Sequence, residues 1–189
     1  MYEARSPIGN IAEMRKKVQS LGAQLLGGYR FVDIIFMEID KRSVDLNIEV
    51  VRLRVSRESH TRTPKALVTE KSILWSGSGC KQDRIRLSSP FETPDEAIRF
   101  IEIHYSGTLE RSFEYSREGW VYCSDNTNFY IEDIALQNFS PSIEVEAEEE
   151  TELTMWFALL DLREIYFNSV PELVRRHLAG IPPEVLQIS

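Results

Sequence analysis

The chain has 189 residues, of which 42% are hydrophobic and 28% are charged, values that are ordinary for a soluble globular domain with one core. Lysine and arginine total 22 against 30 aspartates and glutamates, which gives a formal net charge of -8. This charge disfavours broad attraction to nucleic acid or to an anionic membrane. We therefore expect no nucleic-acid partner, and any anion site must be local.

The N-terminal sequence lacks a basic segment followed by an apolar one, and no apolar run in the chain approaches the roughly 18 residues that a membrane helix needs. We expect a cytoplasmic protein with no membrane partner. The two cysteines, Cys80 and Cys123, form no Cys-x-x-Cys pair, so neither a disulfide framework nor structural zinc is indicated. One domain over residues 1–189 is expected, with a helical C-terminal part from about residue 151, and the sequence leaves a homodimer open.

Most of the expected elements are strands. A short first strand is followed by a helix, because Asn10 and Glu13 form a capping-box pattern and Gly22 is a typical helix stop. Residues rich in β-branched and aromatic side chains then predict four strands, at 24–39, 47–57, 65–73 and 83–87.

A second helix begins at Thr93, where Pro94 takes the first helical position and Glu96 the third. The remaining pattern predicts strands at 108–116, 120–124, 129–136 and 142–148, and then helices at 153–162 and 170–179. Short strands in hairpin-sized steps, without regular βαβ alternation, predict a mainly antiparallel α+β fold, as a sheet or a barrel.

Charged residues recur at even spacing in several predicted strands. Arg52 and Arg54 leave one face of their strand, while the apolar residues between and beside them leave the other. Even spacing also relates the pairs Glu3 and Arg5, Lys65 and Lys71, Arg84 and Arg86, and Glu144 and Glu146. Two arrangements fit this pattern: an antiparallel sheet with one wet face, or a closed barrel whose charged faces converge on a lumen that holds opposite charges, water and ligand.

The order of these motifs resembles the CYTH domain, the triphosphate-tunnel superfamily of class IV adenylyl cyclases, thiamine-triphosphatase-like enzymes and inorganic triphosphatases. The opening Glu-x-Glu-x-Lys of the family corresponds to residues 1–5, where Glu3 and Arg5 are kept and Met1 replaces the first acid. The Arg-x-Arg and Leu-Thr-x-Lys strands of the family correspond to Arg52-Leu53-Arg54 and Val68-Thr69-Glu70-Lys71.

The other family motifs have counterparts in the same order. An Asp-x-x-Phe element matches Asp33 to Phe36, and the basic part of the fifth-strand motif matches Arg84-Ile85-Arg86, with Ser88 where an acid is usual. The last three motifs correspond to Glu110-Arg111-Ser112, Ile131-Glu132-Asp133-Ile134 and Ile143-Glu144-Val145-Glu146. The resemblance therefore extends over nearly the whole chain.

The resemblance implies a closed eight-stranded β-barrel with helices packed outside, in which cationic side chains hold a triphosphate and carboxylates hold Mg²⁺ or Mn²⁺. The implied phosphate ligands are Arg5, Arg52, Arg54, Lys71, Arg84 and Arg111. The implied metal ligands are Glu3, Glu132, Glu144 and Glu146. Guanidinium groups match phosphate oxygens bidentately, and hard divalent cations select carboxylate oxygen, so the residue types suit these roles.

The expected partner is therefore a triphosphate-bearing small molecule, and the first functional hypothesis is a metal-dependent phosphohydrolase acting on inorganic, nucleoside or thiamine triphosphate. Met1, Ser88 and Ser112 support a second hypothesis, a binding protein for nucleotide or polyphosphate without catalysis. An adenylyl cyclase, in which a ribose hydroxyl replaces water as the attacking group, is the third. Because the motifs concern phosphate and metal, they predict that affinity follows the number of phosphates more than the organic group.

Overall fold

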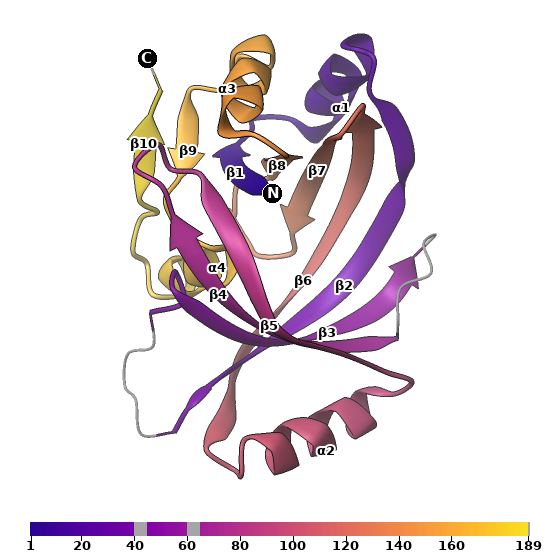
Figure 1. Ribbon diagram of the computed structural model, residues 1–189, viewed down its shortest axis with the longest axis vertical. Coiled ribbons are helices and arrows are strands. Elements are labelled where there is room, and N and C mark those ends of the chain that lie inside the picture. The colour runs from indigo at the N-terminus through magenta and orange to yellow at the C-terminus, as the bar shows by residue number, and fades with distance from the viewer. Residues whose placement is uncertain (40–44, 60–64, 189) are drawn as a thin grey trace.

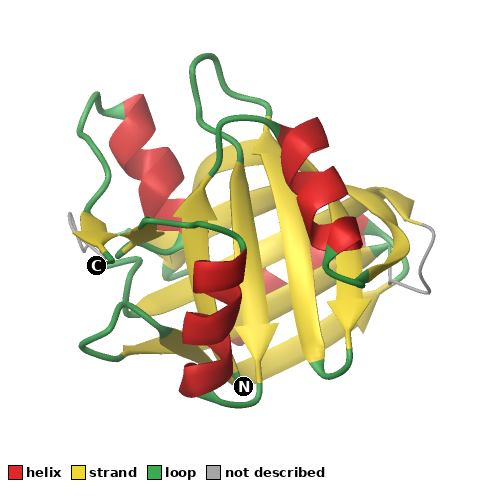
Figure 2. Cartoon of the chain, turned by 90° about the horizontal axis from the view of Figure 1, so that it is seen from above, coloured by secondary structure: helices red, strands yellow, loops and turns green. Residues whose placement is uncertain are grey.

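Eight antiparallel strands of the computed structural model, which describes residues 1–39, 45–59 and 65–188, close into a barrel in the order β1-β5-β4-β3-β2-β6-β7-β8 (Figures 1 and 2). The strands are β1 (Tyr2–Pro7), β2 (Gln24–Glu38), β3 (Glu49–Ser59), β4 (Ala66–Trp75), β5 (Lys81–Phe91), β6 (Leu109–Ser124), β7 (Thr127–Ile134) and β8 (Ser142–Ala147). The closed barrel, rather than a sheet with one wet face, is therefore the arrangement that this sequence adopts.

The described residues form four helices outside the barrel: α1 (Ile11–Ser20), α2 (Pro94–His104), α3 (Glu150–Leu159) and α4 (Val170–Leu178). The predicted helix starts are confirmed, because the side chain of Asn10 accepts from the Glu13 amide and Thr93 forms a full capping box with Glu96. None of the helices in the described parts of the chain is long and apolar enough to cross a membrane.

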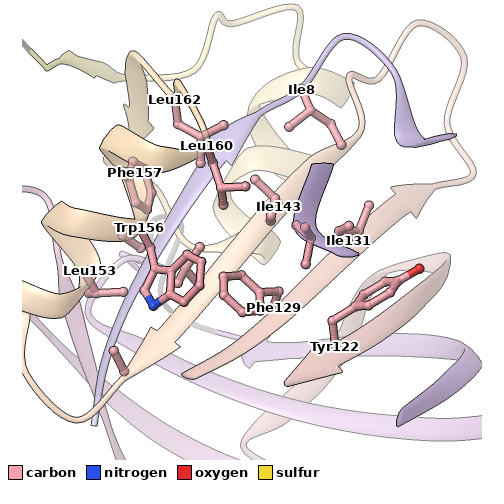
Figure 3. Packing of buried hydrophobic residues seen from close by; sticks show 14 of the residues in the cluster. Ile8, Tyr122, Phe129, Ile131, Ile143, Leu153, Trp156, Phe157, Leu160 and Leu162 are labelled. Atoms are coloured by element: carbon pink, nitrogen blue, oxygen red, sulfur yellow. The ribbon is translucent and has the colours of Figure 1, made fainter. Parts of the chain in front are cut away.

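Apolar side chains on the outer face of the barrel pack under the helices. Leu53 and Val68, on β3 and β4, form one cluster with Ala97 and Ile101 of α2, the helix that lies across the lower end of the barrel in Figure 1. A second cluster lies under α1 and α3; Figure 3 shows the α3 side, where the Trp156 ring meets the ring of Phe129 at its edge, 4.8 Å between centroids. The charged residues between these apolar positions are therefore left to face inward.

The inner face is apolar at the end where α4 begins. Ile35, Val50 and Ile73 of the barrel form one buried cluster with Val170 and Val174 of α4. Val50, Ile73 and Val170 also line the charged cavity described below. This cluster therefore forms one wall of the cavity, and the polar space occupies only part of the barrel interior.

The structure corrects several expectations about the elements. The strands predicted at 108–116 and 120–124 are one continuous strand, β6, which carries Arg117 and Gly119 through the expected break. The C-terminal part holds more than helices, because β9 (Glu164–Tyr166) and β10 (Val185–Gln187) pair in a small antiparallel sheet.

The predicted strand at 83–87 also differs, since β5 begins at Lys81 and its pairing with β4 shifts register. Glu70 faces Leu87 and Lys71 faces Ile85, so Arg86 is an extra residue in β5. Arg84, Ile85 and Arg86 are all exposed. Because side chains alternate between the faces of a strand, this offset places Lys81 and Asp83, not Arg84 and Arg86, on the inner face.

Candidate functional site

A cavity of about 420 Å³ lies inside the barrel, and 11 of the 24 described residues that line it are charged. Its cationic residues are Arg5, Arg52, Arg54, Lys71, Lys81 and Arg117. Its acidic residues are Glu3, Asp83, Glu132, Glu144 and Glu146. Among the described lining residues, cations thus outnumber carboxylates by one when all are ionised, although the chain as a whole carries -8.

The cationic wall is held by Asp33, which is fully buried. Its carboxylate accepts hydrogen bonds from Arg54 Nε and Nη2, at 2.8 and 3.0 Å. Arg117 Nε lies 3.2 Å and Arg52 Nη1 3.7 Å from the same carboxylate. One acid therefore fixes three guanidinium groups from β3 and β6 on one side of the cavity.

Among the described residues, the buried groups at this wall that lack a hydrogen-bond partner include the Nε of Arg52 and the Oγ1 of Thr69. Thr69 lies opposite Arg52 in the pairing of β3 with β4, and both residues line the cavity. Buried polar atoms in native proteins are nearly always hydrogen-bonded, to protein or to other molecules. The two groups are therefore available to atoms that occupy the cavity.

Glu132 forms the centre of a buried network. Its carboxylate lies 2.7 Å from Arg5 Nη1 and 2.9 Å from Arg117 Nη1, and it accepts a short hydrogen bond from the Tyr29 hydroxyl. Strand pairing places Tyr29, Gly119 and Glu132 in one row across β2, β6 and β7. Burial raises the pKa of Tyr29, and the Glu132 carboxylate adds to that effect, so Tyr29 stays a donor.

The carboxylates of Glu3, Glu144 and Glu146 form a separate cluster, with ligand atoms that all lie within 4.8 Å of one another. They meet because Glu3 of β1 pairs with Glu146 of β8. Burial raises the pKa of Glu146, and the negative charges of Glu144 and Glu3 raise it further, to about 7. Burial opposes ionisation of Glu144 as well, but Arg5 and Lys81 hold its pKa well below the ordinary value.

This cluster suits a divalent ion, since hard cations such as Mg²⁺ and Mn²⁺ bind carboxylate oxygens and the close acids repel one another without a counter-charge. Lys81 supplies part of that charge within the protein itself. Its Nζ lies 2.6 Å from Glu3 and 3.3 Å from Glu144. Burial alone would lower the pKa of Lys81, but Glu144 and Glu3 raise it above the ordinary value.

The structure brings together most of the residues expected in the site. Four of the predicted phosphate ligands line the cavity, namely Arg5, Arg52, Arg54 and Lys71. Three of the predicted metal ligands form the acidic cluster, namely Glu3, Glu144 and Glu146. Glu132 lines the same cavity but lies outside this cluster, because its oxygens already contact Arg5, Arg117 and Tyr29.

Arg84 and Arg111 lie outside the cavity lining. Arg84 is exposed as a result of the β5 offset, and the 55% exposed Arg111 pairs with Glu114 on the surface. Lys81, Asp83 and Arg117 were not anticipated. Lys81 and Asp83 have the even spacing that marks a charged strand face, whereas Arg117 fell in the break expected within β6.

No family model matches the chain, and no curated protein matches it by sequence. Several solved structures do resemble it. The PH1012 protein of Pyrococcus horikoshii has a TM-score of 0.71 at 18% identity, over 92% of this chain and 99% of its own. The PH1819 protein of the same organism has a TM-score of 0.73 at 12% identity, over 94% and 99%. HpAC1 from Hippeastrum, described as having a dominant triphosphatase activity, has a TM-score of 0.67 at 11% identity, over 96% of each chain.

The chain shares the fold of these structures. The fold that the motif order implied is therefore confirmed, including the closed ring of eight strands with helices outside. At these identities the likeness concerns the fold, so function has to be argued from the cavity itself.

Proposed function

We propose that the chain is a metal-dependent phosphohydrolase that acts on a triphosphate-bearing small molecule. One observation carries this proposal: a single cavity holds both a cationic wall and a cluster of three carboxylates. Arg52 and Arg54 are on β3, and Glu144 and Glu146 are on β8, which is four strands away from β3 in either direction around the ring. The two kinds of charge thus face each other across the space where a ligand would bind.

The cationic wall would hold the phosphates. Arg52, Arg54 and Arg117 offer guanidinium groups that match phosphate oxygens, and Lys71 offers a compact charge. The unpartnered Arg52 Nε and Thr69 Oγ1 add two hydrogen-bonding groups that the protein leaves unused. Each charge-assisted contact contributes about 1.5–3 kcal/mol, so a polyphosphate that meets several of them would bind far more tightly than a monophosphate.

Glu3, Glu144 and Glu146 would hold Mg²⁺ or Mn²⁺. A divalent ion bound there neutralises phosphate charge and favours attack at phosphorus. The residues of the chain orient the ligand: the cations fix its phosphates, and the buried pairs of Glu132 with Arg5 and Arg117 keep the cavity wall rigid. The triphosphatase activity described for HpAC1, which shares the fold, supports hydrolysis of a triphosphate as the proposed reaction.

A binding protein without catalysis is the second candidate. It was favoured by the loss of family acids at Met1 and Ser88, yet Glu3, Glu144 and Glu146 still have ligand atoms within 4.8 Å of one another. That closeness supports a metal site, and with it the hydrolase. No described residue of the cavity favours a cyclase over a hydrolase. A cytoplasmic location and a homodimer stay predictions from the sequence.

The test is phosphate release from inorganic triphosphate, ATP and thiamine triphosphate, with Mg²⁺, with Mn²⁺ and with a chelator, alongside calorimetric binding. We expect metal-dependent release that is lost in a Glu144→Gln, Glu146→Gln double variant. Glu148→Gln is the matched control, because Glu148 is exposed just beyond β8 and outside the cavity lining. Binding without release would support the second candidate, and neither binding nor release would overturn the proposal.

A further inference from the structure

We propose that the triphosphate ligand carries an apolar or aromatic organic group, which binds against an apolar lip formed by Leu26, Val121 and Tyr130. All three side chains line the same cavity as the charged residues. The inference rests on the proposed function, because the lip borders the cavity that would hold the phosphates. It narrows the substrate class from any triphosphate to triphosphate esters with a sizeable apolar surface.

Leu26 is directed into the lip by a bulge in β2. The pairing with β6 passes from Leu25 opposite Tyr122 to Gly27 opposite Val121, so Leu26 has no partner residue. Bulges commonly re-aim a side chain beside a functional site. Leu26 lines the cavity while 58% of it remains exposed to solvent. A large aliphatic side chain is thus placed at the cavity edge without being covered by the protein.

The lip continues toward the acidic cluster. Strand pairing places Gly27, Val121, Tyr130 and Glu144 in one row across β2, β6, β7 and β8. The Tyr130 hydroxyl donates a hydrogen bond of 3.0 Å to Glu146. Neighbouring strands lie about 4.8 Å apart. A group that packs against Tyr130 would therefore be next to the carboxylates and within reach of the phosphate chain.

The chemistry of the lip selects for apolar surface rather than for the identity of a base. Gly27 and Gly28 present only backbone between Leu26 and Tyr29, and the described lining residues include no asparagine or glutamine. Asparagine and glutamine amides are the side chains that pair bidentately with the hydrogen-bonding edge of adenine. Inorganic triphosphate has no apolar surface and would leave the lip in water, whereas a ring or alkyl group would cover it.

The experiment compares ATP, GTP and thiamine triphosphate with methyl triphosphate, by calorimetry at fixed Mn²⁺. Methyl triphosphate is also an ester, but it lacks a large organic group. We expect Leu26→Ala to weaken binding of the three larger esters by about fivefold, the loss that burying part of one leucine side chain predicts. Binding of methyl and inorganic triphosphate should be unchanged. Val121→Ala is a second variant with the same expected pattern.

Leu25→Ala is the matched control, because Leu25 is the neighbouring leucine, 46% exposed, and lies outside the cavity lining. It should alter none of the affinities. The lip is not a subsite if Leu26→Ala and Val121→Ala change the affinities of the larger esters and of methyl triphosphate equally. The same holds if neither variant changes the affinity of any ester while inorganic triphosphate still binds. In both cases only this inference fails. If no polyphosphate binds the wild-type protein, the proposed function fails, and the inference fails with it.

Discussion

Gly119 and Tyr29 lie so close together that a Cβ atom on residue 119 would be 2.7 Å from the Tyr29 hydroxyl oxygen. The missing side chain lets the Tyr29 ring lie over Gly119 on β6, so that the Tyr29 hydroxyl donates to Glu132 on β7. The ring has little freedom to move aside, since it is stacked on Phe31 with 4.6 Å between the centroids. A glycine in the middle of a strand often marks such a close approach.

Gly119→Ala should destabilise the protein by about 1–3 kcal/mol, the usual cost of overpacking a core. The reason is that Tyr29 must shift and the buried Glu132 then loses a donor. Urea unfolding followed by circular dichroism measures the change. Gly9→Ala is the control, because a Cβ there would meet nothing within 4 Å. Equal effects of the two substitutions would contradict the assigned role of Gly119.

Lys81→Met should strengthen Mn²⁺ binding in the absence of phosphate. The ammonium group of Lys81 lies against Glu3 and Glu144, so a divalent ion has to compete with it for the same carboxylates. The metal-free variant should also be less stable by about 3–5 kcal/mol, because buried carboxylates lose their partner. Calorimetric titration with Mn²⁺ checks the affinity, with the exposed Lys16→Met as control. Unchanged Mn²⁺ affinity in Lys81→Met would argue that the cluster does not hold the ion.

The stability of the metal-free protein should fall as the pH rises from about 4.5 to 7. The pKa of Glu146 is raised from its ordinary 4.5 to about 7, by burial first and then by Glu144 and Glu3. The folded protein therefore holds this proton more tightly than the unfolded chain. Its contribution to stability is complete below pH 4.5 and is lost as the pH passes through 7. Unfolding by urea with a chelator, across this range, measures the slope, and Glu146→Gln should flatten it. An identical slope in the variant would show that another group titrates.

The charged faces of β3, β4 and β8 could be predicted from even spacing, because apolar residues such as Leu53, Val68 and Val145 lie on the opposite face of each strand. Leu53 and Val68 pack under α2, which leaves Arg52, Arg54 and Lys71 to face inward. Glu144 and Glu146 follow the same logic, with Val145 between them in the outer core. In these strands the apolar face packs under the helices, so the opposite, charged face has to line the lumen.

The inward face of β5 could not be predicted in this way. Arg84-Ile85-Arg86 has the same alternation as the other strands, but all three residues are exposed, and an extra residue shifts the pairing with β4. A bulge has no simple sequence signature, and an offset of one residue exchanges the two faces. Arg117 was missed for another reason: it falls in the break expected between the strands at 108–116 and 120–124, whereas β6 runs straight through that break.

Calorimetric comparison of inorganic triphosphate, ATP, ADP, AMP and GTP at fixed Mg²⁺ is the most direct test of the claim that the barrel interior is a polyphosphate site. Lys71→Met and Arg84→Met serve as a matched pair, since Lys71 lines the cavity and Arg84 does not. We predict that affinity falls by orders of magnitude from ATP to AMP, that adenine and guanine differ little, and that Lys71→Met but not Arg84→Met weakens triphosphate binding. AMP binding as tightly as ATP, or no binding of any polyphosphate at millimolar concentration, would contradict the claim.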